Sequence, residues 1–136
     1  MASAIVDTSV WIDFFNGVDS KESLALQNLI TTGEAYLCPT IYQEILQGIR
    51  DDSRFQDVKN ILGAYNIVRA DFPLLQDTAI DLYRSLRKKG ITIRKSNDCL
   101  IAAHALLFNL PVLHNDKDFT QICANTAVKS YLREDI

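Results

Sequence analysis

Hydrophobic positions along the chain form two patterns: short, mostly apolar runs, and longer stretches in which apolar residues recur every three or four positions. The short runs are typical of buried strands and lie at residues 3–6, 35–38, 66–68 and 111–113. The longer stretches predict amphipathic helices at residues 9–15, 21–31, 40–48, 53–62, 72–89, 97–108 and 119–124. A last short strand is expected at 127–130. Because strands alternate with helices, the pattern favours an α/β fold with a largely parallel sheet.

Hydroxyl residues stand where several of these helices are expected to begin. Thr8 or Ser9 is expected to cap the first helix, and Ser96 the helix that starts at the next residue, because their side chains accept backbone N–H groups at a helix start. Thr40 and Gln43 have the spacing of a capping box. The sequence therefore predicts where these helices begin as well as that they exist.

The composition of the chain is ordinary for a globular protein. Its 136 residues are 48% hydrophobic and 23% charged, which predicts a single domain over residues 1–136. No apolar run reaches the length that spans a bilayer, and no basic residue precedes the first apolar stretch as it would in a secretory signal. The cysteines are few and widely spaced, which favours reduced thiols in a cytoplasmic protein with no membrane partner.

Charge is distributed unevenly along the chain. The net charge of −3 argues against a protein that coats nucleic acid as a whole. Yet six of the fourteen basic residues fall between positions 84 and 95. Arg94 and Lys95 end this basic segment just before a predicted helix, and we expect these two residues to contact phosphates of a polyanion.

Four acidic residues occupy equivalent places in the predicted fold. Asp7 follows the first strand and Asp116 follows the fourth, while Glu44 and Asp98 lie near the start of helices. The ends of parallel strands and the starts of the following helices share one edge of a sheet, where ligands bind. We therefore expect the four carboxylates to lie together, although each alone also fits a capping or turn residue.

Such a cluster of carboxylates favours a bound cation. Two carboxylates about 4 Å apart repel by about 4 kcal/mol at an effective dielectric of about 20, so the cluster must take up protons or a cation. Mg²⁺ binds carboxylate oxygens and completes its ligands with water and substrate phosphates. One ion or two would activate water for attack on a phosphorus atom and neutralise the leaving oxygen. The acids thus predict a metal-dependent hydrolase of phosphate esters.

Three segments resemble a known family when they are taken in order. They are IVDTSVWIDFF, TIYQEILQGI and SNDCLIAAHALLFNLPVLHNDKDF, and together they span nearly the whole chain. They are similar to PIN-domain ribonucleases, in particular the VapC toxins of type II toxin–antitoxin pairs. The resemblance implies a three-layer α/β/α sandwich with a short parallel central sheet, and an endoribonuclease that depends on Mg²⁺ or Mn²⁺.

The resemblance also implies roles for residues and partners. Its four acids match Asp7, Glu44, Asp98 and Asp116 as catalytic metal ligands, with supporting residues at Thr8, Ser9, Asn115 and Asp118. The chain departs from the family at His114, where a serine or threonine is frequent. Family members cut structured RNA, often transfer RNA or a ribosomal RNA loop, form homodimers, and are silenced by an antitoxin protein.

Three other functions remain open at this level. A phosphatase of the haloacid-dehalogenase type needs a second aspartate two positions after the first, where this chain has Ser9. A receiver-type signalling module needs an aspartate at the end of the third strand, where Arg69 and Ala70 stand. The third alternative is a catalytically silent PIN-like module that only binds RNA or protein, and the four retained acids count against it.

Overall fold

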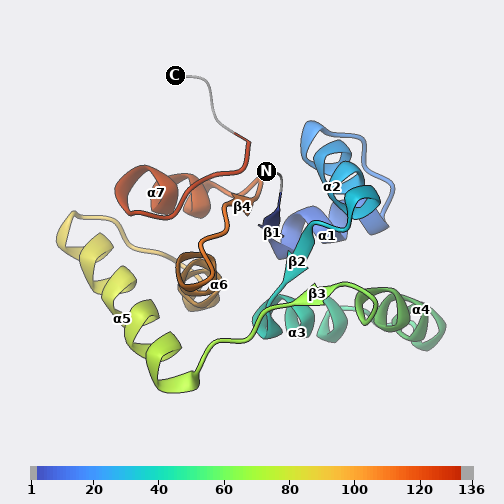
Figure 1. Ribbon diagram of the computed structural model, residues 1–136, viewed down its shortest axis with the longest axis horizontal. Helices are drawn as coiled ribbons and strands as arrows, with labels where there is room; N and C mark the ends of the chain where they lie inside the picture. The colour runs from blue at the N-terminus through green and yellow to red at the C-terminus, as the bar shows by residue number, and fades with distance from the viewer. Residues whose placement is uncertain (1–2, 133–136) are drawn as a thin grey trace.

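The computed structural model describes residues 3–132, in which strands alternate with single helices or helix pairs (Figure 1). The strands are β1 (Ala4–Val6), β2 (Ala35–Leu37), β3 (Asn66–Ile67) and β4 (Val112–Leu113). The helices are α1 (Thr8–Phe15), α2 (Lys21–Thr32), α3 (Pro39–Gln47), α4 (Asp52–Leu62), α5 (Phe72–Lys88), α6 (Ser96–Leu107) and α7 (Lys117–Asn125). The pattern of apolar positions thus predicted each of these elements to within a few residues.

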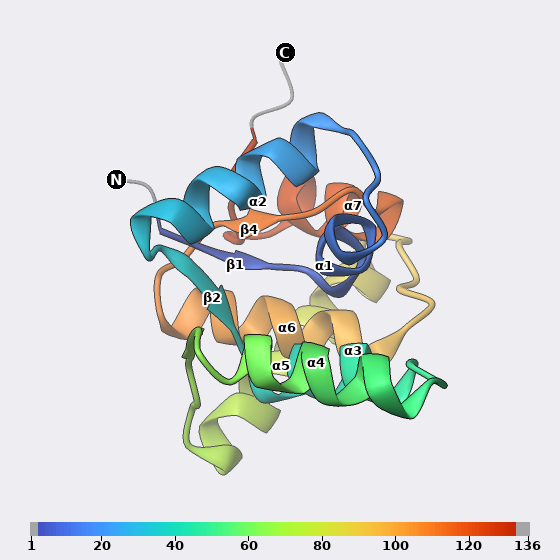
Figure 2. The ribbon, with the colours of Figure 1, turned by 90° about the vertical axis from the view of Figure 1, so that its right-hand side faces the viewer.

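The four strands form one parallel sheet in the order β3-β2-β1-β4. The chain moves outward from β1 to β2 and β3, then returns to the other side of β1 to add β4. Figure 2 shows α2 on one side of the strands and α5 and α6 on the other, which confirms the three-layer α/β/α sandwich. In open α/β sheets a ligand site lies where the strand order reverses, at the carboxyl ends of the strands. Here that point is between β1 and β4.

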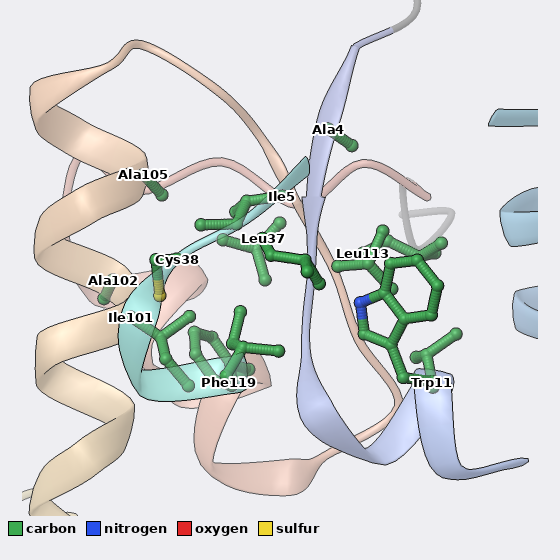
Figure 3. Close-up of a cluster of buried hydrophobic side chains, with 14 of the residues drawn as sticks. Ala4, Ile5, Trp11, Leu37, Cys38, Ile101, Ala102, Ala105, Leu113 and Phe119 are labelled. Atoms are coloured by element: carbon green, nitrogen blue, oxygen red, sulfur yellow. The ribbon is translucent and has the colours of Figure 1, made fainter. Parts of the chain in front are cut away.

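The central strand β1 is buried on both faces, and its side chains divide the core into two halves. In Figure 3, Ile5 lies on the side of α6, whereas Ala4 lies on the opposite side, with Trp11 of α1. Ile5 and Trp11 are both fully buried. A strand covered on both faces has no polar side to expose, which explains why its sequence is continuously apolar.

Helix α6 lies inside the protein and is covered by other helices. It packs against α3, α5 and α7, and most of its residues from Asp98 to Ala105 are buried. On its sheet-facing side, Ala102 and Ala105 point toward β1 (Figure 3). Short side chains here let the helix approach the sheet closely, so the volume available at these positions is small.

The predicted starts of α1, α3, α4 and α6 were each one residue too late, and for α1 and α3 the structure shows the physical reason. Asp7 rather than Thr8 or Ser9 caps α1, because its carboxylate accepts the N–H of Ser9. Pro39 begins α3, since its fixed φ and missing N–H suit the first helical position, and the expected capping box does not form. In α6, Ser96 is already the first helical residue and gives no side-chain cap.

The chain's last predicted strand, at residues 127–130, was also only partly correct. It is reduced to a single parallel bridge between Ser130 and Val112. Two backbone hydrogen bonds hold this segment beside β4. The N–H of Val112 donates to the carbonyl of Lys129, and the carbonyl of Val112 accepts the N–H of Tyr131. Within residues 3–132, no helix combines the length and hydrophobicity needed to cross a membrane.

Replacing Ala102 by leucine tests the close approach of α6 to the sheet. We expect Ala102→Leu to lower the free energy of unfolding by about 1–3 kcal/mol, because the buried site has no room for three extra carbons. Ala124→Leu, at an exposed position of α7, should change it by less than about 0.5 kcal/mol. Denaturant unfolding measures both. Equal effects would contradict the tight packing of α6.

Candidate active site

Asp7 lies at the junction of β1 and α1, and its position is set by both elements. Its backbone N–H donates to the carbonyl of Leu113 at 2.9 Å, which ties the end of β1 to the end of β4. Its Oδ2 accepts hydrogen bonds from the backbone N–H of Ser9 at 3.4 Å and from the Ser9 hydroxyl at 2.8 Å. Burial raises the pKa of Asp7, the Ser9 hydrogen bonds oppose that rise, and the charge of Asp116 adds to it.

Asp98 is a buried acid whose pKa is strongly raised. It stands in the first turn of α6, is 3% exposed, and its Oδ2 is buried without a hydrogen-bond partner. Burial raises the pKa of Asp98 to about 7, and the charges of Asp7 and Asp116 add to the rise while Lys95 opposes it. A buried carboxylate oxygen without a partner is costly to keep ionised. A cation at this oxygen would remove that cost.

Asp116 caps the start of α7 and is the third acid of the site. Its Oδ1 accepts the backbone N–H of Asp118 at 2.9 Å, and its Oδ2 lies 3.5 Å from the ammonium nitrogen of Lys95. Burial lowers the pKa of Lys95, but the charges of Asp98, Asp116 and Asp7 outweigh it and the net shift is upward. Asp7, Asp98 and Asp116, here called the carboxylate cluster, are thus close enough that the charge of Asp116 helps to raise the pKa of the other two.

Glu44 has different contacts from the other three acids. Its Oε1 accepts the hydroxyl of Thr8 at 2.5 Å, and its Oε2 accepts the side-chain amide of Asn97 at 3.0 Å. The structure therefore gives Thr8, which the resemblance implies to be a supporting residue, a protein partner in Glu44. Asn97 was absent from the predicted site, although its place directly before Asp98 in the NDC segment is a signal that could have included it.

The loop before α6 is fastened to α7 through Asp118. This carboxylate is buried, and its Oδ2 lies 3.4 Å from the backbone nitrogen of Arg94 and 3.5 Å from its guanidinium Nε. Asp118 was predicted as a supporting residue, and these contacts show how it positions the segment that leads to Asp98. The side chains of Arg94 and Lys95 remain 74% and 62% exposed, so both can also meet a ligand from solvent.

Asn115, predicted as a supporting residue, and His114, where the chain departs from the family it resembles, hold the loop between β4 and α7. The side-chain amide of Asn115 donates a hydrogen bond to the carboxylate of Asp13 in α1 at 3.0 Å.

His114 makes three contacts in the same loop. Its Nδ1 atom accepts the backbone N–H of Asp116 at 3.4 Å, and its Nε2 atom lies 3.4 Å from the Ser130 hydroxyl. Its ring packs on Phe119. The buried imidazole of His114 thus supports the turn that carries Asp116. In the family that the sequence resembles, this position is frequently serine or threonine.

The carboxylate cluster fits a hard divalent cation by the chemistry of its donors. All three are carboxylates, and the unpartnered Asp98 oxygen and the raised pKa of Asp98 both mark a missing positive charge. Within residues 3–132, no three Asp, Glu, His or Cys side chains stand in the arrangement of an assembled metal site. In this structure the ammonium of Lys95 supplies the nearby positive charge.

Comparison with known proteins shows similarity to one domain family and to proteins named as ribonucleases. The family model described as PIN domain matches residues 4–125. Ribonuclease VapC11 of Mycobacterium tuberculosis and VapC ribonuclease Mb1587 of Mycobacterium bovis are each 30% identical to it over 128 residues. These matches cover 93% of this chain and 96% of each relative.

Solved structures with the same fold come from toxin–antitoxin complexes. VapBC2 of Rickettsia felis, bound to a DNA fragment from its promoter, matches with a TM-score of 0.71 and 19% identity over 93% of this chain and 97% of that one. DNA-bound VapBC of Salmonella typhimurium matches with a TM-score of 0.72 and 18% identity over 97% of this chain and all of that one. At these identities the likeness establishes the shared fold.

The raised pKa of Asp98 makes the stability of the metal-free protein depend on pH. Because the folded pKa of about 7 lies above the unfolded value of 3.8, folding favours the protonated acid and stability falls as pH rises between these values. In EDTA, Asp98→Asn should flatten this fall and raise the free energy of unfolding at pH 8 by up to about 4 kcal/mol, since one pKa unit corresponds to about 1.4 kcal/mol. Denaturant unfolding from pH 4 to pH 8 measures it.

The exposed acid Asp57 of α4 provides the control for this prediction. Asp57→Asn should leave the pH dependence of the wild type in place. If wild type and Asp98→Asn lost stability equally between pH 4 and pH 8, the unfavourable ionisation of Asp98 would be disproved.

Proposed function

The chain belongs to the PIN domain family, and from this premise we propose that its carboxylate cluster is the active site of a metal-dependent endoribonuclease, the toxin of a toxin–antitoxin pair. One observation carries the proposal. The three acids of the cluster come from the ends of β1 and β4 and the start of α6, and meet where the strand order reverses. A cluster of carboxylates at that place is suited to binding a divalent cation, which in turn can bind the phosphate groups of a substrate.

Asp7, Asp98 and Asp116 are the residues that would hold Mg²⁺, or Mn²⁺ in its place. When bound, such an ion supplies an activated water molecule and stabilises charge on the leaving oxygen of a phosphodiester. The chain's own contribution is to fix the three acids. Ser9 holds the carboxylate of Asp7, and the backbone N–H of Asp118 holds that of Asp116. Fixed donors lower the cost of assembling the site.

Arg94 and Lys95 are proposed to bind the phosphates that flank the bond to be cut. Both side chains are more than half exposed and stand directly beside the cluster, since their contacts are with Asp118 and Asp116. A cation bound by the carboxylates would weaken the hold of Asp116 on Lys95 and make its ammonium available to RNA. Contacts of this kind attract any RNA backbone, so they position the substrate without selecting its sequence.

The names of the relatives and structural neighbours support a proposal for the substrate and partners. Two of them are named ribonucleases, and several structural neighbours are complexes of a toxin with its antitoxin. We therefore propose RNA as substrate, with a transfer RNA or a ribosomal RNA loop as the target, and a cognate antitoxin protein as the inhibitor. A homodimer in the cytoplasm is the proposed working form.

Cleavage of RNA by the purified chain tests the proposed activity. Cutting should require Mg²⁺ or Mn²⁺ and stop in EDTA, and Asp7→Asn or Asp98→Asn should lower the rate at least about 100-fold, because each removes a ligand of the ion. Asp57→Asn, at the exposed control position of α4, should cut as wild type does. Folded wild type that leaves total RNA intact with either metal would instead favour the module that only binds.

Binding of RNA at increasing salt tests the two cations. In the inactive Asp98→Asn background, replacing both Arg94 and Lys95 by alanine should weaken binding and reduce the slope of log K against log salt by about 1.4, since about 0.7 counterions are released per contact. The matched pair is Lys21→Ala with Lys59→Ala, at exposed positions of α2 and α4. An unchanged slope in the Arg94 and Lys95 variant would assign these side chains to solvent.

A further inference from the structure

Glu44 joins the two chain segments that carry the most buried acids of the site. Its hydrogen-bond donors are Thr8, the residue directly after Asp7, and Asn97, the residue directly before Asp98. Thr8 is 36 positions away from Glu44 and Asn97 is 53 positions away. The contacts are therefore tertiary, and one carboxylate connects the starts of α1 and α6.

The position of α3 explains how a single side chain reaches both helices. Helix α3 packs against α1 and against α6, with Ile41 and Ile45 buried in the core. Glu44 stands beside these residues on the same helix and is partly buried. The backbone of α3 is thus anchored independently of the carboxylate cluster, which makes it a suitable fixed point for the two helix starts.

We propose that Glu44 is a positioning residue, whose hydrogen bonds to Thr8 and Asn97 set the separation of Asp7 and Asp98, and that it is not itself a metal ligand. This inference rests on the proposed metal-binding function of the carboxylate cluster. Both Glu44 oxygens already have donors, and hydrogen bonds to an ionised carboxylate are among the stronger ones. Binding a cation directly would require one or both donors to be released.

The chemistry of the two donors supports the same role. An ionised carboxylate can only accept, so Glu44 makes the Thr8 hydroxyl and the Asn97 amide donate toward it. This fixes the direction of both side chains and, through the backbone, the adjacent residues Asp7 and Asp98. Partners that orient ligands in this way typically change metal affinity about 10- to 100-fold when they are removed.

Two substitutions at Glu44 separate positioning from direct ligation. Glu44→Gln keeps an oxygen that accepts from Asn97 and an amide that donates to the Thr8 hydroxyl, while it removes the negative charge. Glu44→Ala removes both hydrogen bonds. A positioning residue should tolerate the glutamine better than the alanine, whereas a ligand of the ion should be disabled by both.

Mn²⁺ affinity, measured by calorimetry or electron paramagnetic resonance on the full chain without RNA, is the principal readout. We expect Glu44→Ala to weaken Mn²⁺ binding about 10- to 100-fold and Glu44→Gln to remain within about threefold of wild type. Gln43→Ala, at an exposed neighbouring position of α3, is the matched control and should bind as wild type. Equal losses in both Glu44 variants, or wild-type affinity in Glu44→Ala, would overturn the proposal.

A double variant tests the donors and keeps the proposal open to refutation if Glu44→Ala does not fold. Thr8→Val combined with Asn97→Ala leaves Glu44 in place and should still weaken Mn²⁺ binding about 10-fold or more. Adding Glu44→Ala to this pair should cost less than about a further twofold, because the donors through which it acts are gone. Undiminished affinity in the Thr8 and Asn97 variant would overturn the positioning role.

RNA cleavage by the same proteins distinguishes this inference from the proposed function. Wild type that binds Mn²⁺ with the expected ranking of variants but cuts no RNA would disprove the nuclease and leave the positioning role of Glu44 in place. Cutting by wild type together with equal Mn²⁺ losses in Glu44→Gln and Glu44→Ala would do the reverse. Wild type that binds no Mn²⁺ would remove both.

Discussion

Repulsion between buried carboxylates is the constraint around which this site is organised. Burial raises the pKa of Asp7 and of Asp98, and the charge of Asp116 adds to both rises, while the Asp98 oxygen without a donor is the clearest sign of the cost. The protein tolerates this cost because two of the acids also serve as helix caps, so the fold itself holds them in place. The capping interpretation of Asp7 and Asp116 is therefore confirmed, and it is compatible with the metal-binding role proposed for the same two carboxylates.

The topology of the sheet explains why acids distant in sequence meet. Asp7 and Asp116 follow strands that are adjacent only because β4 is added beside β1 after β2 and β3 have formed on the other side. Asp98 joins them from α6, the helix whose small residues let it lie against the sheet. In this member of the PIN domain family, the packing of the core therefore determines the geometry of the site.

Much of this could be predicted from the sequence, and the exceptions have two causes. Hydrophobic periodicity and strand-end acids are local signals, so the elements, the sheet and three of the acids were accessible. The contacts of Glu44 with Thr8 and Asn97 depend on how α3 packs against two other helices, and spacing along the chain carries no record of that. Helices α1 and α3 begin one residue earlier than predicted. The carboxylate of Asp7, rather than a nearby hydroxyl, accepts the free N–H at the start of α1, and Pro39 suits the first helical position of α3.

The bond between His114 and Ser130 joins the end of the described chain to the site. The segment around Ser130 runs beside β4, and the same imidazole that lies near its hydroxyl accepts the N–H of Asp116. The opposite end of the chain enters the sheet at Ala4, at the edge away from the carboxylates. The two ends are therefore not equivalent for protein engineering. An affinity tag or fluorescent fusion placed before β1 is attached at the side of the sheet away from the carboxylates. One placed after Ser130 is attached to the segment that contacts His114, and it can therefore disturb the turn that carries Asp116.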